Sequence, residues 1–117
     1  MSQERQRKSP ILQGTLDLMV LKTLAAMGPM HGYGLARRIE QLSDDAMQIS
    51  QGTIYLFLVR LVHRGWIHAA WGTSENNRRA KFYSISKAGG KQLVTETQNW
   101  QRVAGIIGRL LRLDTRG

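Results

Sequence analysis

The chain has 117 residues, 42% of them apolar, which is enough for one globular domain with a modest core. Its 17 Lys and Arg against 8 Asp and Glu give a formal charge of +9, which favours nucleic acid as a partner, with an anionic membrane surface second. The absence of cysteine excludes disulfides and thiolate metal sites, and the sequence shows neither a signal peptide nor a membrane span, so we expect a cytoplasmic protein.

The first segment, residues 1–10, is polar and basic and carries Arg5, Arg7 and Lys8. We expect a flexible arm that lies on phosphate groups, with a frayed terminus of no particular function as the alternative. The folded domain is expected to begin at residue 11.

The first expected helix covers residues 14–27. Thr15 is its candidate N-cap, and Asp17 would then lie in the first turn, where a carboxylate meets the helix dipole. This helix is apolar on most of its circumference, which predicts burial on more than one side. Because the domain is small, we expect part of that cover to come from a second subunit, with Leu16 and Met19 at the interface.

A second helix is expected to follow the turn at residues 31–34 and to end near Leu42. Its apolar residues recur at helical spacing and predict one inward face. His31, at the start of the turn, is a candidate phosphate contact or helix cap, and a plain turn residue is the alternative. A loop and a short extended piece then lead to the next helix, as in a helix-turn-helix.

The third expected helix, from Ser50 to Gly65, carries most of the functional prediction. Ser50 can cap the first turn with its hydroxyl, and Gly65 stands where a left-handed residue is favoured after a helix. The first turn offers amide, hydroxyl and free N–H groups, which suits a DNA major groove, whereas an ordinary capped core helix is the alternative. The buried face is expected to be formed by Ile54, Leu58, Leu61 and Val62.

Two strands are expected after this helix, at residues 66–71 and 80–85, because both stretches are rich in aromatic and β-branched residues. The turn between them carries two adjacent arginines. Three helices followed by a basic-tipped hairpin is the order of a winged helix, so residues 11–86 are predicted to be mainly α-helical with a small two-stranded antiparallel sheet. A solvated turn is the alternative for the basic residues, and Trp66 and Trp71 are expected to pack within the hairpin.

The last segment, residues 87–117, is predicted to be a dimerisation helix, capped by Ser86 and extending to about Leu113. Its apolar positions alternate at spacings of four and three, which is the pattern of a heptad seam. A domain of this size has no other evident need for so long a helix. The predicted seam consists of Leu93, Thr97, Trp100, Ala104, Ile107 and Leu111.

Several short motifs, in this order and spacing, resemble the PadR family of bacterial transcriptional regulators. They are Gly-Pro-Met-His-Gly-Tyr-Gly at 28–34, Gln-Gly-Thr-Ile-Tyr at 51–55, Glu-Asn-Asn-Arg-Arg-Ala-Lys-Phe-Tyr at 75–83 and Ser-Lys-Ala-Gly at 86–89. The resemblance covers about residues 12–100 and implies a winged-helix homodimer, usually a repressor, that binds a palindromic promoter site. One departure is Leu56, since the family commonly has proline after the tyrosine, where it would fix the first helical turn.

The resulting hypothesis places the helices at 50–65 of two subunits in successive major grooves of double-stranded DNA, roughly 34 Å apart. Gln51 and Thr53 are the candidates for base edges, since glutamine can bind adenine through two hydrogen bonds. Arg60 and Arg64 are candidate phosphate contacts, with ion pairs to Glu40 or Asp44 as the alternative. The other expected phosphate contacts are Tyr33, Ser50, Tyr55, Arg78, Arg79 and Lys81.

The resemblance also implies that some relatives sense aromatic or hydrophobic small molecules. Trp100 lies on the predicted seam and is the candidate to stack on such an effector in a cavity between the subunits. A tryptophan packed in the dimer core is the alternative.

No catalytic pattern is present, so we expect no enzyme activity, no metal and no cofactor. His63 and His68 are five residues apart with Gly65 between them, which is a poor spacing for metal ligands, and no phosphate-binding loop or nucleophile elbow occurs. The competing function is a basic adaptor that binds protein or membrane through the C-terminal helix. The favoured partners are duplex DNA and a second copy of the chain, and not a membrane.

Overall fold

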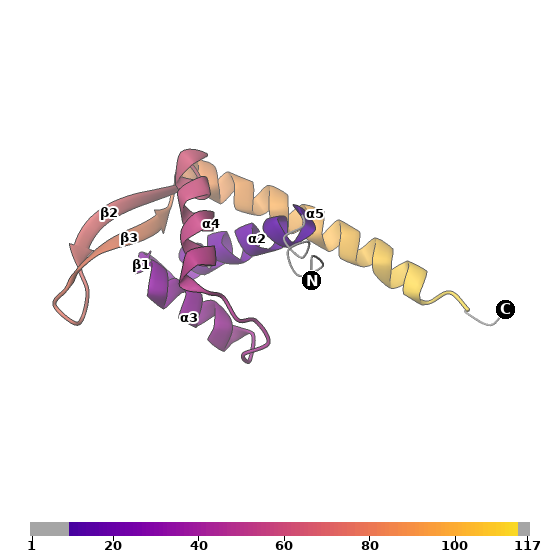
Figure 1. The fold of residues 1–117 in the computed structure, drawn as a ribbon. Coiled ribbons are helices and arrows are strands. Elements are labelled where there is room, and N and C mark those ends of the chain that lie inside the picture. The colour runs from indigo at the N-terminus through magenta and orange to yellow at the C-terminus, as the bar shows by residue number, and fades with distance from the viewer. Residues whose placement is uncertain (1–9, 115–117) are drawn as a thin grey trace.

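The computed structural model describes residues 10–114, with side chains from residue 14 onward, and shows a helical domain with a small sheet at one end (Figure 1). The predicted winged-helix class is confirmed, and the expected arm at residues 1–10 lies outside the described residues except for Pro10. In chain order the elements are α2 (Pro10–Met27), β1 (Met30–His31), α3 (Gly32–Leu42), α4 (Gln51–His63), β2 (Ile67–Thr73), β3 (Arg79–Ile85) and α5 (Lys87–Leu111).

The sheet has three strands in the order β1-β3-β2, so the prediction of two strands is wrong in number. Strand β1 pairs antiparallel with β3, with Met30 opposite Tyr83 and His31 opposite Phe82. Two residues are too few to show the alternation of polar and apolar side chains that identifies a strand. Strand β1 is defined by its pairing with β3, which lies some fifty positions later in the chain. The sequence near Met30 and His31 therefore does not predict a strand.

Helix α2 begins at Pro10 and not at the predicted Thr15 cap. Proline suits the first helical position, because its missing N–H is one that a helix start leaves unpaired in any case. Asp17 consequently lies in the second turn and does not meet the dipole at the helix start as predicted.

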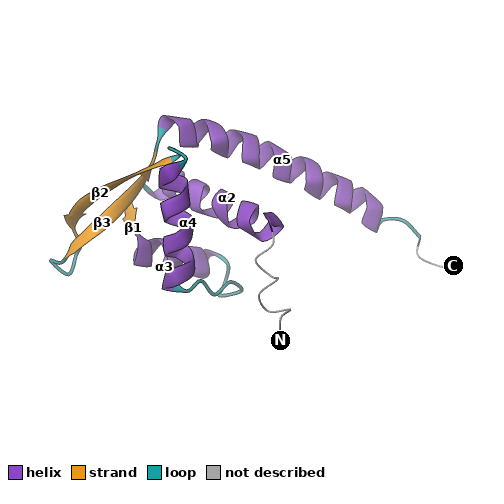
Figure 2. Cartoon of the chain, turned by 45° about the horizontal axis from the view of Figure 1, so that its top comes forward, coloured by secondary structure: helices purple, strands orange, loops and turns teal. Residues whose placement is uncertain are grey.

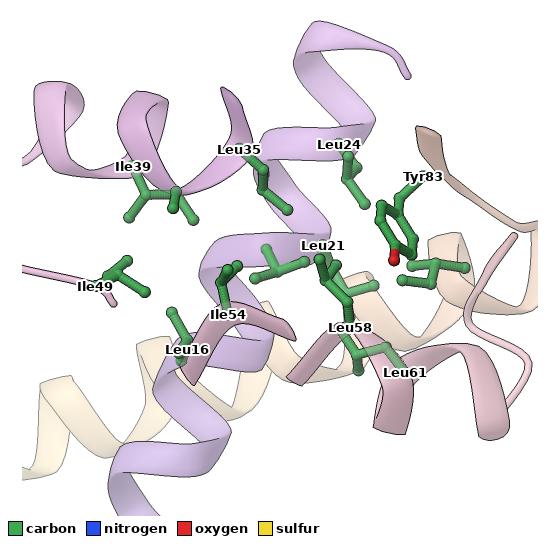
Figure 3. Close-up of a cluster of buried hydrophobic side chains, with 13 residues drawn as sticks. Leu16, Leu21, Leu24, Leu35, Ile39, Ile49, Ile54, Leu58, Leu61 and Tyr83 are labelled. Atoms are coloured by element: carbon green, nitrogen blue, oxygen red, sulfur yellow. The ribbon is translucent and has the colours of Figure 1, made fainter. Parts of the chain in front are cut away.

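The core is built around α2, which contacts α3, α4, α5 and β3 of the same chain. Val20, Leu21 and Leu24 are almost completely buried, and side chains of α3 and α4 converge on them together with Tyr83 of β3 (Figure 3). Leu16 is also buried in this core by its own chain, which contradicts its predicted place in a dimer interface. The expected second cover of α2 comes largely from its own chain.

The junction between the sheet and α5 is fixed by a group of short hydrogen bonds. The Ser86 hydroxyl donates to the Gly65 carbonyl at 2.6 Å and accepts from the Gly89 amide at 2.9 Å, which confirms Ser86 as the cap of α5. Gly65 has a φ of +78°, as expected for the residue after α4. From this junction α5 extends past the end of α2 and away from the sheet (Figure 1, Figure 2). None of the helices within residues 10–114 is long and apolar enough to cross a membrane.

Gly89 should tolerate no side chain, because a Cβ there would overlap the Trp66 carbonyl oxygen and lie 2.9 Å from Ile85 Cγ1. We expect Gly89→Ala to lower the free energy of unfolding by about 3 kcal/mol or more, as in the upper range for overpacked sites. Gly90→Ala is the matched control, since no atom lies within 4 Å of its Cβ position. That variant should gain up to about 1 kcal/mol from helix propensity. Urea denaturation measures both, and equal effects at the two positions would contradict the packing described for the junction.

Candidate nucleic-acid interface

The start of α4 is an ordered and solvent-exposed helix terminus. The Ser50 hydroxyl accepts from the Thr53 amide at 3.1 Å and donates to the Thr53 hydroxyl at 2.9 Å, so both side chains take part in the predicted cap. Gln51 and Gly52 lie exposed beside them. The terminus therefore presents one free amide side chain and the unpaired backbone N–H groups of a helix start.

A groove of about 730 Å³ separates this terminus from the hairpin of β2 and β3, which we call the wing. The groove brings together residues that are far apart in sequence, from His31 to Tyr83, with Tyr33 from α3, Gln51 and Tyr55 from α4, and basic residues from the wing. Tyr33 and Tyr55 have most of their area exposed. Six of the residues predicted to contact DNA line it: Tyr33, Gln51, Tyr55, Arg78, Arg79 and Lys81.

The wing holds two of its cations over an exposed tryptophan. The guanidinium carbon of Arg79 lies 4.9 Å from the centre of the Trp71 ring, and Lys81 Nζ lies 5.3 Å from it. Trp71 is 59% exposed, so it does not pack inside the hairpin as predicted. Its position follows from the strand register, because Trp71 is directly opposite Lys81 and two residues from the Thr73–Arg79 pair, which lies on the same face of the sheet. Cation–π contacts of this kind hold the two charges on the side of the wing that faces the groove.

Arg60 lies on the other side of α4 and forms an ion pair with Asp17 of α2, at 2.7 Å between Nη2 and Oδ1. Neither predicted partner is used, since Glu40 pairs with Arg37 at 3.1 Å and accepts from the Ile49 amide at 2.8 Å. The Arg60 guanidinium also stacks on the Phe57 ring at 4.5 Å. The direction of this side chain supports a role in joining α4 to α2 more than a role in phosphate binding.

Burial raises the pKa of the Asp17 carboxyl above its usual range, and the neighbouring Arg60 guanidinium opposes that shift without cancelling it. Arg64, one turn further along α4, lies at 5.1 Å over the Trp66 ring. Neither Arg60 nor Arg64 lines the groove between α4 and the wing. The structure therefore divides the predicted basic residues between a groove-facing group on the wing and a structural pair at the back of α4.

Helix α5 carries an apolar face that its own chain leaves uncovered. Leu93 is half-buried against the core and Ala104 is half-buried, but the C-terminal half of the helix projects beyond the domain (Figure 2). A contiguous run of large apolar side chains is unusual on a solvent-exposed surface and marks an interaction site. The exposed members are Trp100, Val103, Ile106, Ile107, Leu110 and Leu111.

Within residues 10–114, no cluster of three or more His, Asp or Glu is arranged to hold a metal ion. Buried side-chain nitrogen and oxygen atoms in that part of the chain all have hydrogen-bond partners.

Comparison with known proteins places these features in a common fold. The model described as the transcriptional regulator PadR-like family matches residues 20–95. A transcriptional regulator of Clostridium thermocellum has 25% identity and a TM-score of 0.78, covering 89% of this chain and all of that one. A PadR-like transcriptional regulator of Bacillus cereus has 25% identity and a TM-score of 0.76, covering 91% of this chain and all of that one. The uncharacterized protein X of Lysinibacillus sphaericus is 27% identical over 100 residues, which are 86% of this chain and 91% of that protein.

The ion pair at the back of α4 is testable by Arg60→Gln, which keeps a polar side chain but removes the guanidinium that pairs with the buried Asp17 carboxylate. We expect a loss of about 3 kcal/mol in the free energy of unfolding at about pH 7, since an unpaired buried charge is costly. Because the folded-state pKa of Asp17 is raised, this cost develops as pH rises through that pKa. It should fade below about pH 4, where the carboxyl is neutral in both folded and unfolded chains.

Two further variants complete this test by urea denaturation over a pH series. The double variant Asp17→Asn, Arg60→Gln should regain most of the lost stability, because no buried charge is then left alone. Arg102→Gln, at an exposed position of α5, should change stability by less than about 0.5 kcal/mol. A penalty for Arg60→Gln that is the same at every pH would show that the pair with Asp17 is not its source.

Proposed function

The chain belongs to the PadR-like family of transcriptional regulators, and we propose that it acts as a homodimer that represses transcription by binding a palindromic promoter site. It is thus a regulator and not an enzyme. The observation that carries the proposal is the groove between the start of α4 and the wing. There an exposed glutamine, two tyrosines and three cations face the same space.

The two sides of this groove have different roles in the proposal. Gln51, free at the helix start, contacts base edges in the major groove, where a glutamine can bind adenine through two hydrogen bonds. Thr53 also contacts base edges, through the hydroxyl that accepts a hydrogen bond from the Ser50 cap. Arg79 and Lys81, held over Trp71, bind phosphates of the adjacent backbone and carry little sequence information. Arg78, Tyr33, Tyr55 and Ser50 complete the phosphate contacts.

The dimer in this proposal forms through the exposed apolar face of α5. Each large apolar side chain that a partner covers contributes about 1.5–3 kcal/mol by transfer scales, which are upper bounds. Six such side chains are exposed on this face, enough for two copies to associate. A two-fold pair then presents its α4 helices to successive major grooves, roughly 34 Å apart along the duplex. A palindromic site is the DNA counterpart of that symmetry.

The same face of α5 supports a place for an effector. Trp100 is exposed there and its ring is available to a partner or to a flat apolar molecule. In the proposed dimer, an aromatic or hydrophobic compound bound beside Trp100 alters the spacing of the two α4 helices and thereby the affinity for DNA.

The DNA-binding roles are testable with a duplex that the protein itself selects from a random library, compared with a scrambled duplex and with anionic vesicles. The selected duplex should bind about a thousandfold more tightly than the scrambled one. Arg79→Ala should weaken binding to all sequences alike and reduce the salt slope by about 1. Gln51→Ala should instead change which sequences are preferred. A uniform loss from both variants would refute this division of roles, and tight vesicle binding without duplex preference would favour the adaptor function.

The dimer is testable by Ile107→Glu, which places a charge in the middle of the apolar face of α5. We expect a folded monomer by sedimentation equilibrium. Its affinity for the palindromic duplex should fall by about a hundredfold, because the two half-sites are no longer bound together. Leu42→Glu, at an exposed position at the end of α3, is the control and should stay dimeric. If Ile107→Glu also stays dimeric, another surface joins the subunits.

A further inference from the structure

The outward face of α4 is apolar from Gly52 to Val59, before it ends at His63, which is unexpected on a molecule with a formal charge of +9. Leu56 is 62% exposed and Val59 is 46% exposed, although each could have been polar at no cost to the core. Gly52, one turn before Leu56, has open space where a Cβ would lie. Together these three residues form a strip along α4 from its second to its ninth residue, which we call the outer strip.

Helical geometry places the outer strip opposite the buried face. Successive residues of an α-helix are about 100° apart, so Gly52, Leu56 and Val59 cluster on one side. The buried Ile54, Leu58 and Leu61 cluster roughly 180° away, against α2. The groove lined by Gln51 and Tyr55 lies on one flank of the outer strip, and the Arg60–Asp17 pair lies on the other.

The size of the outer strip argues against a protein partner. Two large side chains are far below the roughly 800 Å² that each partner contributes to a stable interface. The strip also adjoins the groove that holds the glutamine and the wing cations. A ligand that spans both surfaces therefore needs negative charges where it meets the wing cations and an apolar part where it meets the outer strip.

The major groove of DNA has this chemistry. Its rims are phosphates, and its floor carries the C5-methyl group of thymine, which proteins contact with apolar side chains. A helix whose first turns enter the groove presents its outward face to that floor. With no side chain at Gly52, the α4 backbone can come close to the base edges.

We propose that Leu56 and Val59 determine specificity by packing against thymine C5-methyl groups in each half-site. This inference rests on the proposed function and assigns to α4 a second, apolar mode of base reading. Gln51 at the helix start supplies the hydrogen-bonding part of recognition, and the outer strip supplies the part that depends on the methyl group. The preferred half-site then contains thymine next to the base that Gln51 contacts.

Replacing thymidine with deoxyuridine tests this directly, because it removes the methyl group and leaves base pairing and charge unchanged. The probe is the duplex that the full-length protein selects from a random library, resynthesised with deoxyuridine at one thymidine of each half-site at a time. At one or two positions the wild-type protein should lose roughly fourfold in affinity per methyl removed, the effect of one buried methylene-sized group. The salt slope should not change, since no phosphate contact is lost.

Leu56→Ala ties the effect to this side chain. The variant should bind the thymidine duplex more weakly than the wild type does and should lose the preference for thymidine over deoxyuridine at one position. Leu56→Met, which keeps a large apolar side chain, should retain it. Leu42→Ala, at an exposed apolar residue on α3, is the matched control and should discriminate as the wild type does. All four proteins should have the same unfolding midpoint, because both positions are exposed.

Two results would overturn the inference while the proposed function stands. One is a wild-type protein that binds its selected duplex specifically but is indifferent to deoxyuridine at every thymidine. The other is a Leu56→Ala variant that discriminates as strongly as the wild type, together with a Val59→Ala variant that does the same. If the selection enriches no duplex at all, that result contradicts the proposed function itself, and the thymine-methyl contact, which depends on it, is contradicted as well.

Discussion

Helix α2 lies at the centre of the domain, and the apolar contacts that α3, α4 and α5 make with it determine the direction of α4. Leu21 and Leu24 of α2 are almost fully buried and meet Leu58 and Leu61 of α4 in one cluster (Figure 3). The Arg60–Asp17 pair adds a directional contact between the same two helices. A buried ion pair contributes little net stability, but it disfavours rotations of α4 that would separate the charges. The start of α4 and the wing consequently keep a fixed relation.

Each side of α4 has a separate task as a result. One side is buried against α2, one faces the groove and the wing, one carries the Arg60–Asp17 pair, and the outer strip of Gly52, Leu56 and Val59 faces solvent. The wing supplies charge at a distance from the helix, so the helix itself needs few cations to bind a polyanion. This separation explains how a strongly basic chain can have an apolar outward face on the helix that we propose reads DNA.

Sequence patterns predicted the parts of the structure that depend on local chemistry. The caps at Ser50 and Ser86 and the left-handed Gly65 follow from hydrogen bonding and sterics within a few residues. The buried face of α4 follows from helical period, except that Val62, predicted to be buried, is exposed. Short sequence motifs predicted the groove residues individually, but no local pattern predicts that Tyr33 and Arg79 line the same groove. Features that depend on distant pairing were missed. Strand β1 exists only through β3, and Asp17 meets Arg60 across 43 positions.

The central claim is that two copies of α4 and the wing bind duplex DNA as a two-fold pair, and hydroxyl-radical footprinting on the selected duplex tests it most directly. The account predicts two protected patches on each strand, centred roughly one helical turn apart, with the wings protecting the flanking phosphates. A single protected patch, or a cleavage ladder unchanged by saturating protein, would contradict it.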